Sequence, residues 1–421
     1  MNWCVLAVLR WLLLIKNNRV EKVVSILEKP VKPGEAELFE IALNQAFEND
    51  YSFALWRLPN DATKNLILAY TVKTLEPKAP IEDLSSGFIF APFDKTKSRY
   101  HLHADLMFSF SAGELKEPTD SHSRSSYEWL QEAVTKSFVQ SKNRFFHKES
   151  SKLFSSDKVS YERLVKKGID QIEAGVVEKI VPSRAQHIYL PDSFDVIETF
   201  EKLCEAYPNA MISFVSIPNV GTWIGASPEL LIHVENNHIF KTVALAGTKP
   251  FEPGTNIKDV AWTQKEIEEQ AMVCRYIISN FKKIRLREYD EQGPKTIVAG
   301  NVMHLKTTYA VDMKETNFPQ LGSVMLQLIH PTSAVCGMPL EESLTFLKEN
   351  EGYDREFYAG YLGPVNINNN ICLYVNLRCM QLLGSQAILY AGAGVTADSV
   401  PESEWEETEI KLNTLLKVIH P

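Results

Sequence analysis

Runs of apolar residues, many of them β-branched or aromatic, recur along the chain and predict β-strands. Most lie after about residue 150, at 178–190, 211–216, 222–234, 238–244, 296–302, 371–383 and 386–391, and two shorter runs lie at 87–92 and 106–111. Asn236 and Asn237 separate two of these runs, which favours a tight hairpin turn. Strands that follow each other through such turns favour antiparallel sheets.

Between these runs, apolar residues recur three and four positions apart, which predicts helices. The helices are expected at about 34–48, 126–142, 159–174, 193–206, 263–283, 318–329, 340–349 and 404–418. Thr263 and Glu266 have the spacing of a capping box at the start of one of them, and the polar stretch 112–126 predicts a loop. Together the elements predict an α+β protein with helices packed outside its sheets.

The composition of the 421 residues, 45% hydrophobic and 23% charged, is ordinary for a soluble globular protein. A formal net charge of −9 and the lack of a dense Lys/Arg tract disfavour binding to nucleic acid. The six cysteines are scattered and form no CxxC pair, which favours buried thiols in a reducing cytoplasm.

The first residues form a short apolar stretch at 3–15, interrupted by Arg10. The stretch is too short to span a bilayer and lacks the basic flank and cleavage site of a signal peptide. We therefore expect a buried or spuriously extended start rather than an interfacial anchor, and membrane association is not expected.

A glycine-rich turn followed by a charged helix is the most informative feature of the chain. Gly392 and Gly394 end an apolar run, and Glu404, Glu407 and Lys411 follow at helical spacing. Glycines leave backbone N–H groups accessible to a ligand, carboxylates suit a hard cation, and an ammonium group suits a carboxylate. The pattern predicts a cation bound beside a small acid, although an i,i+4 pair such as Glu407 and Lys411 is more often a solvated helix face.

Several other segments place polar residues at or near the ends of apolar runs. Taken singly, each has an ordinary explanation, such as a solvated lysine, a turn carboxylate or a buried histidine. The segments are Glu178-Lys179-Ile-Val-Pro-Ser-Arg184, Trp223-Ile-Gly-Ala-Ser-Pro-Glu229, Leu245-Ala246-Gly247-Thr248, the helix with Glu269, Val302-Met-His304, His330-Pro-Thr332, Arg355-Glu-Phe-Tyr358 and Leu377-Arg378.

Together, these segments resemble the motifs of the chorismate-binding enzymes, and the C-terminal one matches nearly residue for residue. This family includes isochorismate, salicylate, anthranilate and aminodeoxychorismate synthases. The resemblance is strong over 155–421, the expected catalytic core, and weak over 1–154, the expected N-terminal part of the same α+β unit. It implies two large antiparallel sheets that face each other, with the active site between them.

The resemblance implies an acid and a base on opposite faces of the substrate ring. Lys179 would deprotonate water, and Glu229 would be the general acid at the C4 hydroxyl of chorismate. Such a lysine must act as a neutral amine, and such a glutamate must be protonated, so their surroundings must differ.

The resemblance also implies Mg²⁺ as the cofactor, with Glu269 and Glu407 as its ligands. Glu266 and Glu404, three residues earlier in each case, could hold metal-bound water. A small number of carboxylates completed by water and a substrate oxygen suits Mg²⁺.

A further set of positions matches the residues with which the family contacts its substrate. Gly247 and Thr248 form a turn, His304 lies nearby, and the remaining residues would grip the enolpyruvyl carboxylate. This last group comprises Tyr358, Arg378, Gly392 and Lys411. An arginine suits the task because its fork can meet two oxygens at once.

Two positions favour one member of the family. Lys179 stands where relatives that use ammonia typically have glutamine, and Ala246 stands where aminodeoxychorismate synthases usually have lysine. Both indicate an isochorismate synthase that uses water and needs no glutaminase subunit. Salicylate synthase, which also expels pyruvate, is the nearest alternative. A non-catalytic chorismate-binding subunit is disfavoured because the matched acid, base and metal positions are all retained.

The departures from the family pattern are few. Pro182 replaces an aliphatic residue, Gln270 stands where many relatives have histidine, and Tyr361-Leu362 replaces smaller residues. These changes bear on the shape of the pocket more than on the reaction. The product of such an enzyme could feed either menaquinone or siderophore synthesis.

Overall fold

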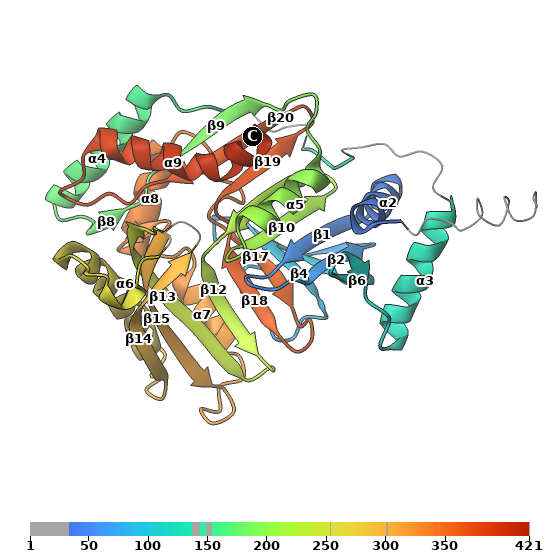
Figure 1. Ribbon diagram of the computed structural model, residues 1–421. Coiled ribbons are helices and arrows are strands. Elements are labelled where there is room, and N and C mark those ends of the chain that lie inside the picture. The colour runs from blue at the N-terminus through green and yellow to red at the C-terminus, as the bar shows by residue number, and fades with distance from the viewer. Residues whose placement is uncertain (1–32, 137–143, 149–153, 253, 300–301, 421) are drawn as a thin grey trace, which may run out of the picture.

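The computed structural model describes residues 33–136, 144–148, 154–252, 254–299 and 302–420 (Figure 1). The apolar stretch at 3–15 lies outside the described residues. All strand pairs in the described part are antiparallel, and two sheets of nine strands dominate the fold. The predicted α+β class with large antiparallel sheets is therefore confirmed.

Each large sheet combines strands from both halves of the chain. In spatial order, the first contains β7 (Glu114–Leu115), β6 (Leu106–Ser111), β2 (Lys64–Ala69), β1 (Ser52–Arg57), β10 (Met211–Ile217), β11 (Gly221–Ser227), β19 (Cys379–Leu383), β20 (Gln386–Gly392) and β9 (Ser183–Tyr189). The second contains β14 (Asp290–Ala299), β15 (Val302–Asp312), β13 (Ile239–Pro250), β12 (Leu230–Glu235), β18 (Ile371–Val375), β17 (Tyr361–Val365), β4 (Gly87–Ala91), β5 (Arg99–His103) and β3 (Val72–Leu75). A small third sheet pairs β8 (Lys179–Ile180) with β16 (Gly337–Met338).

The helices cover the two large sheets (Figure 1). Those against the first sheet are α2 (Glu35–Glu48), α3 (Ser121–Lys136), α5 (Val196–Ala206) and α9 (Pro401–Ile419), and α4 (Lys158–Glu173) lies alongside α9. Those against the second sheet are α6 (Gln264–Lys283) and α7 (Leu321–Ile329), and α8 (Leu340–Asn350) adjoins the small sheet. Within the described residues, no helix has the length and apolarity needed to cross a bilayer.

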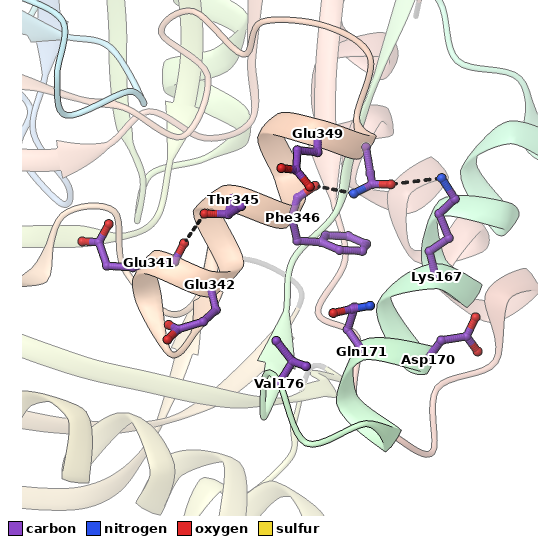
Figure 2. A pocket seen from close by; sticks show the side chains of 10 residues that line it. Lys167, Asp170, Gln171, Val176, Glu341, Glu342, Thr345, Phe346 and Glu349 are labelled. Carbon is purple, nitrogen blue, oxygen red and sulfur yellow. Dashed lines mark hydrogen bonds between the residues drawn. The ribbon is translucent and has the colours of Figure 1, made fainter.

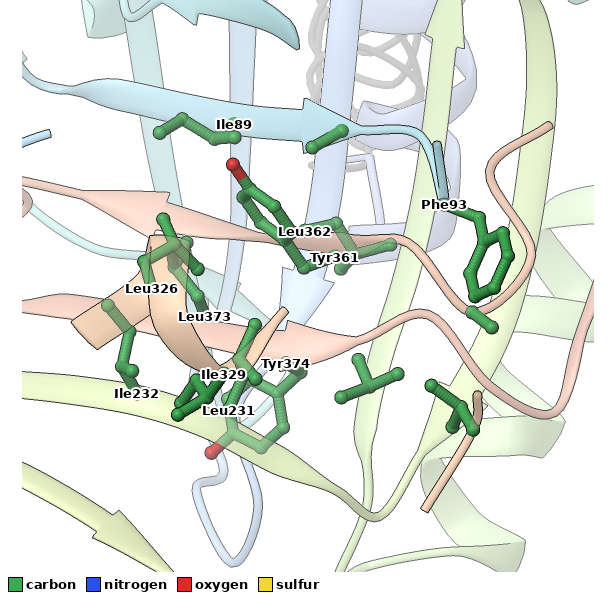
Figure 3. Packing of buried hydrophobic residues seen from close by; sticks show 14 of the residues in the cluster. Ile89, Phe93, Leu231, Ile232, Leu326, Ile329, Tyr361, Leu362, Leu373 and Tyr374 are labelled. Carbon is green, nitrogen blue, oxygen red and sulfur yellow. The ribbon is translucent and has the colours of Figure 1, made fainter. Parts of the chain in front are cut away.

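Alternation along the strands divides the core into two layers. In β1, Phe53 and Leu55 belong to the cluster beneath the helices, whereas Ala54 and Trp56 belong to the cluster shared by the two sheets. Trp56 lies 5.3 Å from Phe88 of β4, measured between ring centroids, so the two sheets face each other across this second cluster. Figure 3 shows part of it, where α7 packs on β12, β18 and β17.

Three of the predicted strands are broken where the chain leaves one sheet. The run at 178–190 divides into β8 and β9, that at 222–234 into β11 and β12, and that at 371–383 into β18 and β19. Proline cannot donate to a strand ladder, and Pro182 and Pro228 lie at the first two breaks. Arg378, with a positive φ of 48°, lies at the third. Each of these three apolar runs is continuous in the sequence, so its pattern did not predict the crossover between sheets that it contains.

Two local predictions near the turns had different outcomes. Asn236 and Asn237 have positive φ values of 51° and 60° and join β12 to β13, which confirms the hairpin. The predicted loop at 112–126 was too long, because it contains β7 and the first residues of α3. The N–H of Ser123 donates to Asp120 Oδ1 at 2.8 Å, which fixes the start of this helix.

A buried ion pair connects the segments around the small sheet. Arg355 and Glu351 have side chains only 2% and 3% exposed, and Arg355 Nε donates to Glu351 Oε2 at 2.8 Å. The guanidinium group also donates to the carbonyl oxygens of Val181 and Val335, each at 2.7 Å. Glu351 Oε1 in turn accepts from the N–H of Ser183 at 2.7 Å. The pair thus ties the break between β8 and β9 to two distant loops.

Glu351→Gln should destabilise the protein by about 3–5 kcal/mol, because it leaves the charge of Arg355 buried without a counter-ion. Urea-induced unfolding followed by circular dichroism measures the change. The matched control is Asp170→Asn, whose ion pair with Lys166 is 55–59% exposed and whose loss should cost at most about 0.5 kcal/mol. Equal stability losses for the two variants would contradict the role given to the buried pair.

Candidate active site

Lys179 extends from the small sheet across the glycine-rich turn. Its backbone pairs with Met338, and the next residue, Ile180, exchanges hydrogen bonds with Val395 at 3.2 and 2.8 Å. A Cβ atom placed on Gly394 would lie 3.0 Å from Cε and 3.4 Å from Nζ of Lys179, so the lysine side chain passes closely over this glycine. Lys179 is 12% exposed, and its Nζ lies 3.6 Å from Glu269 Oε1.

Glu229 lies at the crossover between β11 and β12, next to a second crossover. Its carbonyl oxygen accepts from the N–H of Val375 at 3.0 Å, and the N–H of Ala226 donates to the carbonyl oxygen of Arg378 at 3.0 Å. These bonds join the break that carries Glu229 to the break that carries Arg378. Two residues 149 positions apart are thereby placed at one junction of the sheets.

The surroundings of Glu229 favour its protonated form. Burial raises the pKa of its carboxyl group, whereas a hydrogen bond from the Thr332 hydroxyl at 3.1 Å and the charges of three nearby cations lower it. The cations are Lys179, Lys411 and Arg378. Because burial has the larger effect, the net pKa of Glu229 lies above its ordinary value.

The turn at Gly247 forms a bulge in β13 that binds both a carboxylate and a histidine. The pairing of β13 with β15 shifts between Ala246 and Lys249, as is common beside active sites. Gly247 has a φ of +66°, its N–H donates to Glu269 Oε2 at 3.2 Å, and its carbonyl oxygen accepts from Nδ1 of His304 at 2.8 Å. Thr248 lies in the bulge, but its side chain is outside the described part of the structure.

His304 is held in one tautomer by this arrangement. Burial lowers its pKa, with the charge of Arg378 acting in the same direction, whereas the bond to Gly247 and the charge of Glu269 raise it. The net shift is downward, so the ring is neutral near pH 7, with its proton on Nδ1 and its acceptor nitrogen at Nε2.

Helix α9 presents charged residues toward the turn that ends β20. Lys411 Nζ donates to the carbonyl oxygen of Gly392 at 2.8 Å and lies 2.6 Å from Glu407 Oε1. Burial lowers the pKa of Lys411, and the neighbouring Glu407 partly offsets this effect. Glu404 lies one turn earlier on the same helix and is buried.

Tyr358 and Arg378 complete the group. Tyr358 is buried and stacks on Tyr390 with ring centroids 5.4 Å apart. A Cβ atom on Gly392 would lie 3.1 Å from the Tyr358 hydroxyl, so this hydroxyl reaches the glycine turn. Burial lowers the pKa of Arg378, whereas Tyr358, Glu407 and Glu229 raise it. These side chains are therefore close enough to interact electrostatically.

The carboxylates predicted to bind a metal are arranged in two different ways. Glu269 and Glu407 are 43% and 48% exposed and each faces a lysine. Glu266 instead caps α6, as the capping-box pattern predicted, by accepting from the N–H and hydroxyl of Thr263 at 2.6 and 2.9 Å. It also lies 3.5 Å from Lys249 Nζ.

Within the described residues, no three His, Cys, Asp or Glu side chains are grouped closely enough to hold a metal ion by themselves. Two accessible carboxylates nevertheless suit Mg²⁺, which retains several waters and commonly takes further oxygens from a substrate. Glu269 and Glu407 are the residues with this character.

Two contributors were not identified as functional from the sequence. Thr332 was named only as part of a matched segment, and in the structure its hydroxyl bonds to Glu229. Gly394 was noted only for its exposed backbone, whereas in the structure its lack of a side chain makes room for Lys179. The His-Pro-Thr and Gly-Ala-Gly segments were visible, but nothing in their spacing indicates these contacts.

A separate surface hollow of about 670 Å³ lies between α4 and α8 (Figure 2). Phe346 and Val176 line it together with several carboxylates, and Lys167 Nζ donates to Asn350 Oδ1 at 3.0 Å along its edge. None of the predicted site residues lines this hollow. It is therefore distinct from the group of residues around Glu229.

The chain is similar to known proteins in both sequence and fold. The family model described as chorismate binding enzyme matches residues 95–420. Isochorismate synthase EntC of Escherichia coli (strain K12) is 28% identical over 267 residues, which cover 62% of this chain and 67% of the relative. Anthranilate synthase component 1 of Bacillus pumilus is 28% identical over 272 residues, which cover 62% of this chain and 51% of the relative.

Solved structures show the same fold. MenF, the menaquinone-specific isochorismate synthase from Escherichia coli, superposes with a TM-score of 0.69 and 21% identity, covering 90% of this chain and 91% of that chain. Anthranilate synthase component I from Streptococcus pneumoniae TIGR4 superposes with a TM-score of 0.63 and 19% identity, covering 90% of this chain and 85% of that chain. One fold thus carries both activities, and specific side chains must distinguish them.

Glu229→Gln should stabilise the protein relative to wild type, and the gain should grow as the pH rises. Because the pKa of Glu229 is raised in the folded state, the stability that its protonation provides is present below the unfolded value of about 4.3 and is lost as the pH passes through the folded value. Glutamine does not titrate and avoids this loss. Thermal unfolding at pH 4 and pH 8 measures the difference.

The control is Glu406→Gln on the exposed face of α9, where there is no burial to relieve. A gain for Glu229→Gln that is the same at both pH values, or that is larger at pH 4, would contradict a raised pKa at this carboxyl group.

Proposed function

The chain belongs to the family of chorismate-binding enzymes, and from this premise we propose that it converts chorismate to isochorismate with water as the nucleophile. The observation that carries the proposal is that Lys179 lies close enough for its charge to act on Glu229, a buried carboxyl group whose pKa is raised. Lys179 extends from the small sheet, whereas Glu229 lies at the crossover between β11 and β12. Relatives that use ammonia typically have glutamine at the position of Lys179.

In the proposed reaction, Lys179 accepts a proton from a water molecule. The resulting hydroxide forms the new C–O bond at C2 of chorismate. The close contact with Gly394 supports this role, because it restricts the direction of the lysine side chain.

Glu229 completes the reaction on the other face of the ring. As the double bonds shift, the C4–O bond breaks, and Glu229 donates its proton so that the hydroxyl leaves as water. The atoms balance, because one water is added and one is released. The hydrogen bond from Thr332 supports the role by fixing the orientation of the carboxyl group.

The remaining residues would bind the substrate. Lys411, Arg378 and Tyr358 surround the glycine turn and would hold the enolpyruvyl carboxylate, together with the backbone of Gly392. On the other side, His304 and the turn at Gly247 and Thr248 would contact the ring substituents. The cluster of positive groups suits a substrate with two carboxylates.

We further propose that Glu269 and Glu407 hold Mg²⁺, and that Glu266 and Glu404, three residues earlier in each case, bond metal-bound water, Glu266 in addition to its capping bonds to Thr263. The bound ion supplies positive charge at the ring carboxylate. Glu269 is fixed for this purpose by the N–H of Gly247. The protein would act in the cytoplasm, without a glutaminase subunit, and supply isochorismate for menaquinone or siderophore synthesis.

Lys179→Gln tests the role of the base. We expect the rate of isochorismate formation to fall by about 10²–10⁴-fold, the usual contribution of a general base, while the circular dichroism spectrum and unfolding midpoint stay close to wild type. The matched control is Lys166→Gln on the exposed face of α4, which should retain full activity. Substantial isochorismate formation by Lys179→Gln would overturn the mechanism.

Product analysis separates the proposed reaction from its alternatives. Purified protein incubated with chorismate and Mg²⁺ should yield isochorismate alone, and EDTA should abolish the reaction. Chromatography that detected salicylate and pyruvate would identify a salicylate synthase instead. A chain that leaves chorismate unchanged, with or without ammonium salts, would be a non-catalytic binding subunit.

A further inference from the structure

A buried arginine of the first sheet makes several contacts with helix α9. Arg184 of β9 is 1% exposed. Its guanidinium group makes three contacts with α9. Nε donates to Thr408 Oγ1 at 2.6 Å, Nη2 forms an ion pair with Glu409, and the guanidinium carbon lies 3.9 Å from the ring centroid of Trp405. These contacts fall on a single turn of the helix.

The same turn of α9 carries the residues that face the candidate site. In the sequence, Trp405 directly follows Glu404 and Thr408 directly follows Glu407. Lys411 lies one helical turn after Glu407. Successive residues of an α-helix differ by about 100° in direction. A rotation of α9 that releases the contacts of Arg184 would therefore also turn the two carboxylates and Lys411 away from the site.

The position of Arg184 in β9 also connects it to the backbone that Lys411 contacts. Arg184 pairs with Ala391, and the preceding residue, Ser183, pairs with Gly392. The carbonyl oxygen of Gly392 is the acceptor for Lys411. Two neighbouring residue pairs of β9 and β20 thus hold both the arginine that contacts α9 and the carbonyl oxygen that accepts from Lys411.

Two contacts between this part of α9 and α4 are weaker. Tyr161 of α4 meets Trp405 in a T-shaped arrangement with centroids 5.9 Å apart. The ion pair between Lys158 and Glu402 is 44–66% exposed, so its contribution is small. By contrast, Arg184 is buried, and its charge-assisted bonds have fixed directions.

We propose that Arg184 is a positioning residue that fixes the rotation and axial position of α9, and so sets the geometry of Glu407 and Lys411. The inference rests on the proposed function, because it assigns these two side chains to metal and substrate binding. The planar guanidinium group of Arg184 is needed for this role as well as its positive charge. A lysine ammonium could not bond to Thr408 and Glu409 while also stacking on Trp405.

The test compares Arg184→Lys with Arg163→Lys, which makes the same change on the exposed side of α4. Hydrogen exchange of the peptide covering 401–419 and the affinity for Mn²⁺, measured by electron paramagnetic resonance, are read in the absence of substrate. For Arg184→Lys we expect exchange in α9 to become about 10-fold faster and the Kd for Mn²⁺ to rise about 10-fold. The control should match wild type in both.

Kinetics provide a readout that a merely structural role would not produce. In Arg184→Lys, the KM for chorismate should rise about 10-fold through the displaced Lys411, with a smaller fall in kcat, because Lys179 and Glu229 lie outside α9. Thr408→Val and Glu409→Gln, which each remove one partner, should change Mn²⁺ affinity and KM in the same direction but less. These two variants provide the same measurements if Arg184→Lys does not fold.

Failure of this inference differs from failure of the proposed function. A folded Arg184→Lys variant whose α9 exchange, Mn²⁺ affinity and KM all equal those of wild type would overturn the positioning role, whatever reaction the wild type catalyses. Faster α9 exchange in a protein that makes no isochorismate would instead support the attachment by Arg184 and reject the proposed reaction.

Discussion

The ion pair between Arg355 and Glu351 is the constraint on which the site depends. Its guanidinium group bonds to the carbonyl oxygens of Val181 and Val335, and its carboxylate accepts from the N–H of Ser183. A buried charge that loses any of these partners is costly. The strand with Lys179, the loop that leads from Thr332 and the segment that leads to Tyr358 are therefore held in one arrangement.

A second constraint comes from the way the chain passes between sheets. Glu229 and Arg378 lie at two crossovers that are hydrogen-bonded to each other, and Lys179 lies just before a third. At a crossover the hydrogen-bonded ladder of the strands ends. A side chain there need not follow the in-and-out alternation of a strand, which would otherwise bury it in one layer of the core. Three of the proposed site residues thus lie where the regular strand pairing is interrupted.

Charge at this junction opposes the overall charge of the protein. The chain carries a formal net charge of −9, yet Lys179, Lys411 and Arg378 all act on Glu229. The charges of Lys411 and Arg378 suit acidic ligands, and burial still raises the pKa of the Glu229 carboxyl group. Acid chemistry and binding of carboxylates can therefore coexist in one site.

Local patterns in the sequence determined the α+β class, most of the helices, the hairpin at Asn236 and the capping box at Thr263, because these depend on neighbouring residues. The motifs also included Lys179, Arg378 and Lys411, whose charges act on Glu229 in the structure. Only the tertiary structure decided that three apolar runs are broken between sheets, that Thr332 bonds to Glu229, and that Gly394 makes room for Lys179. These features depend on contacts between segments far apart in the chain, where periodicity and spacing carry no information about distance.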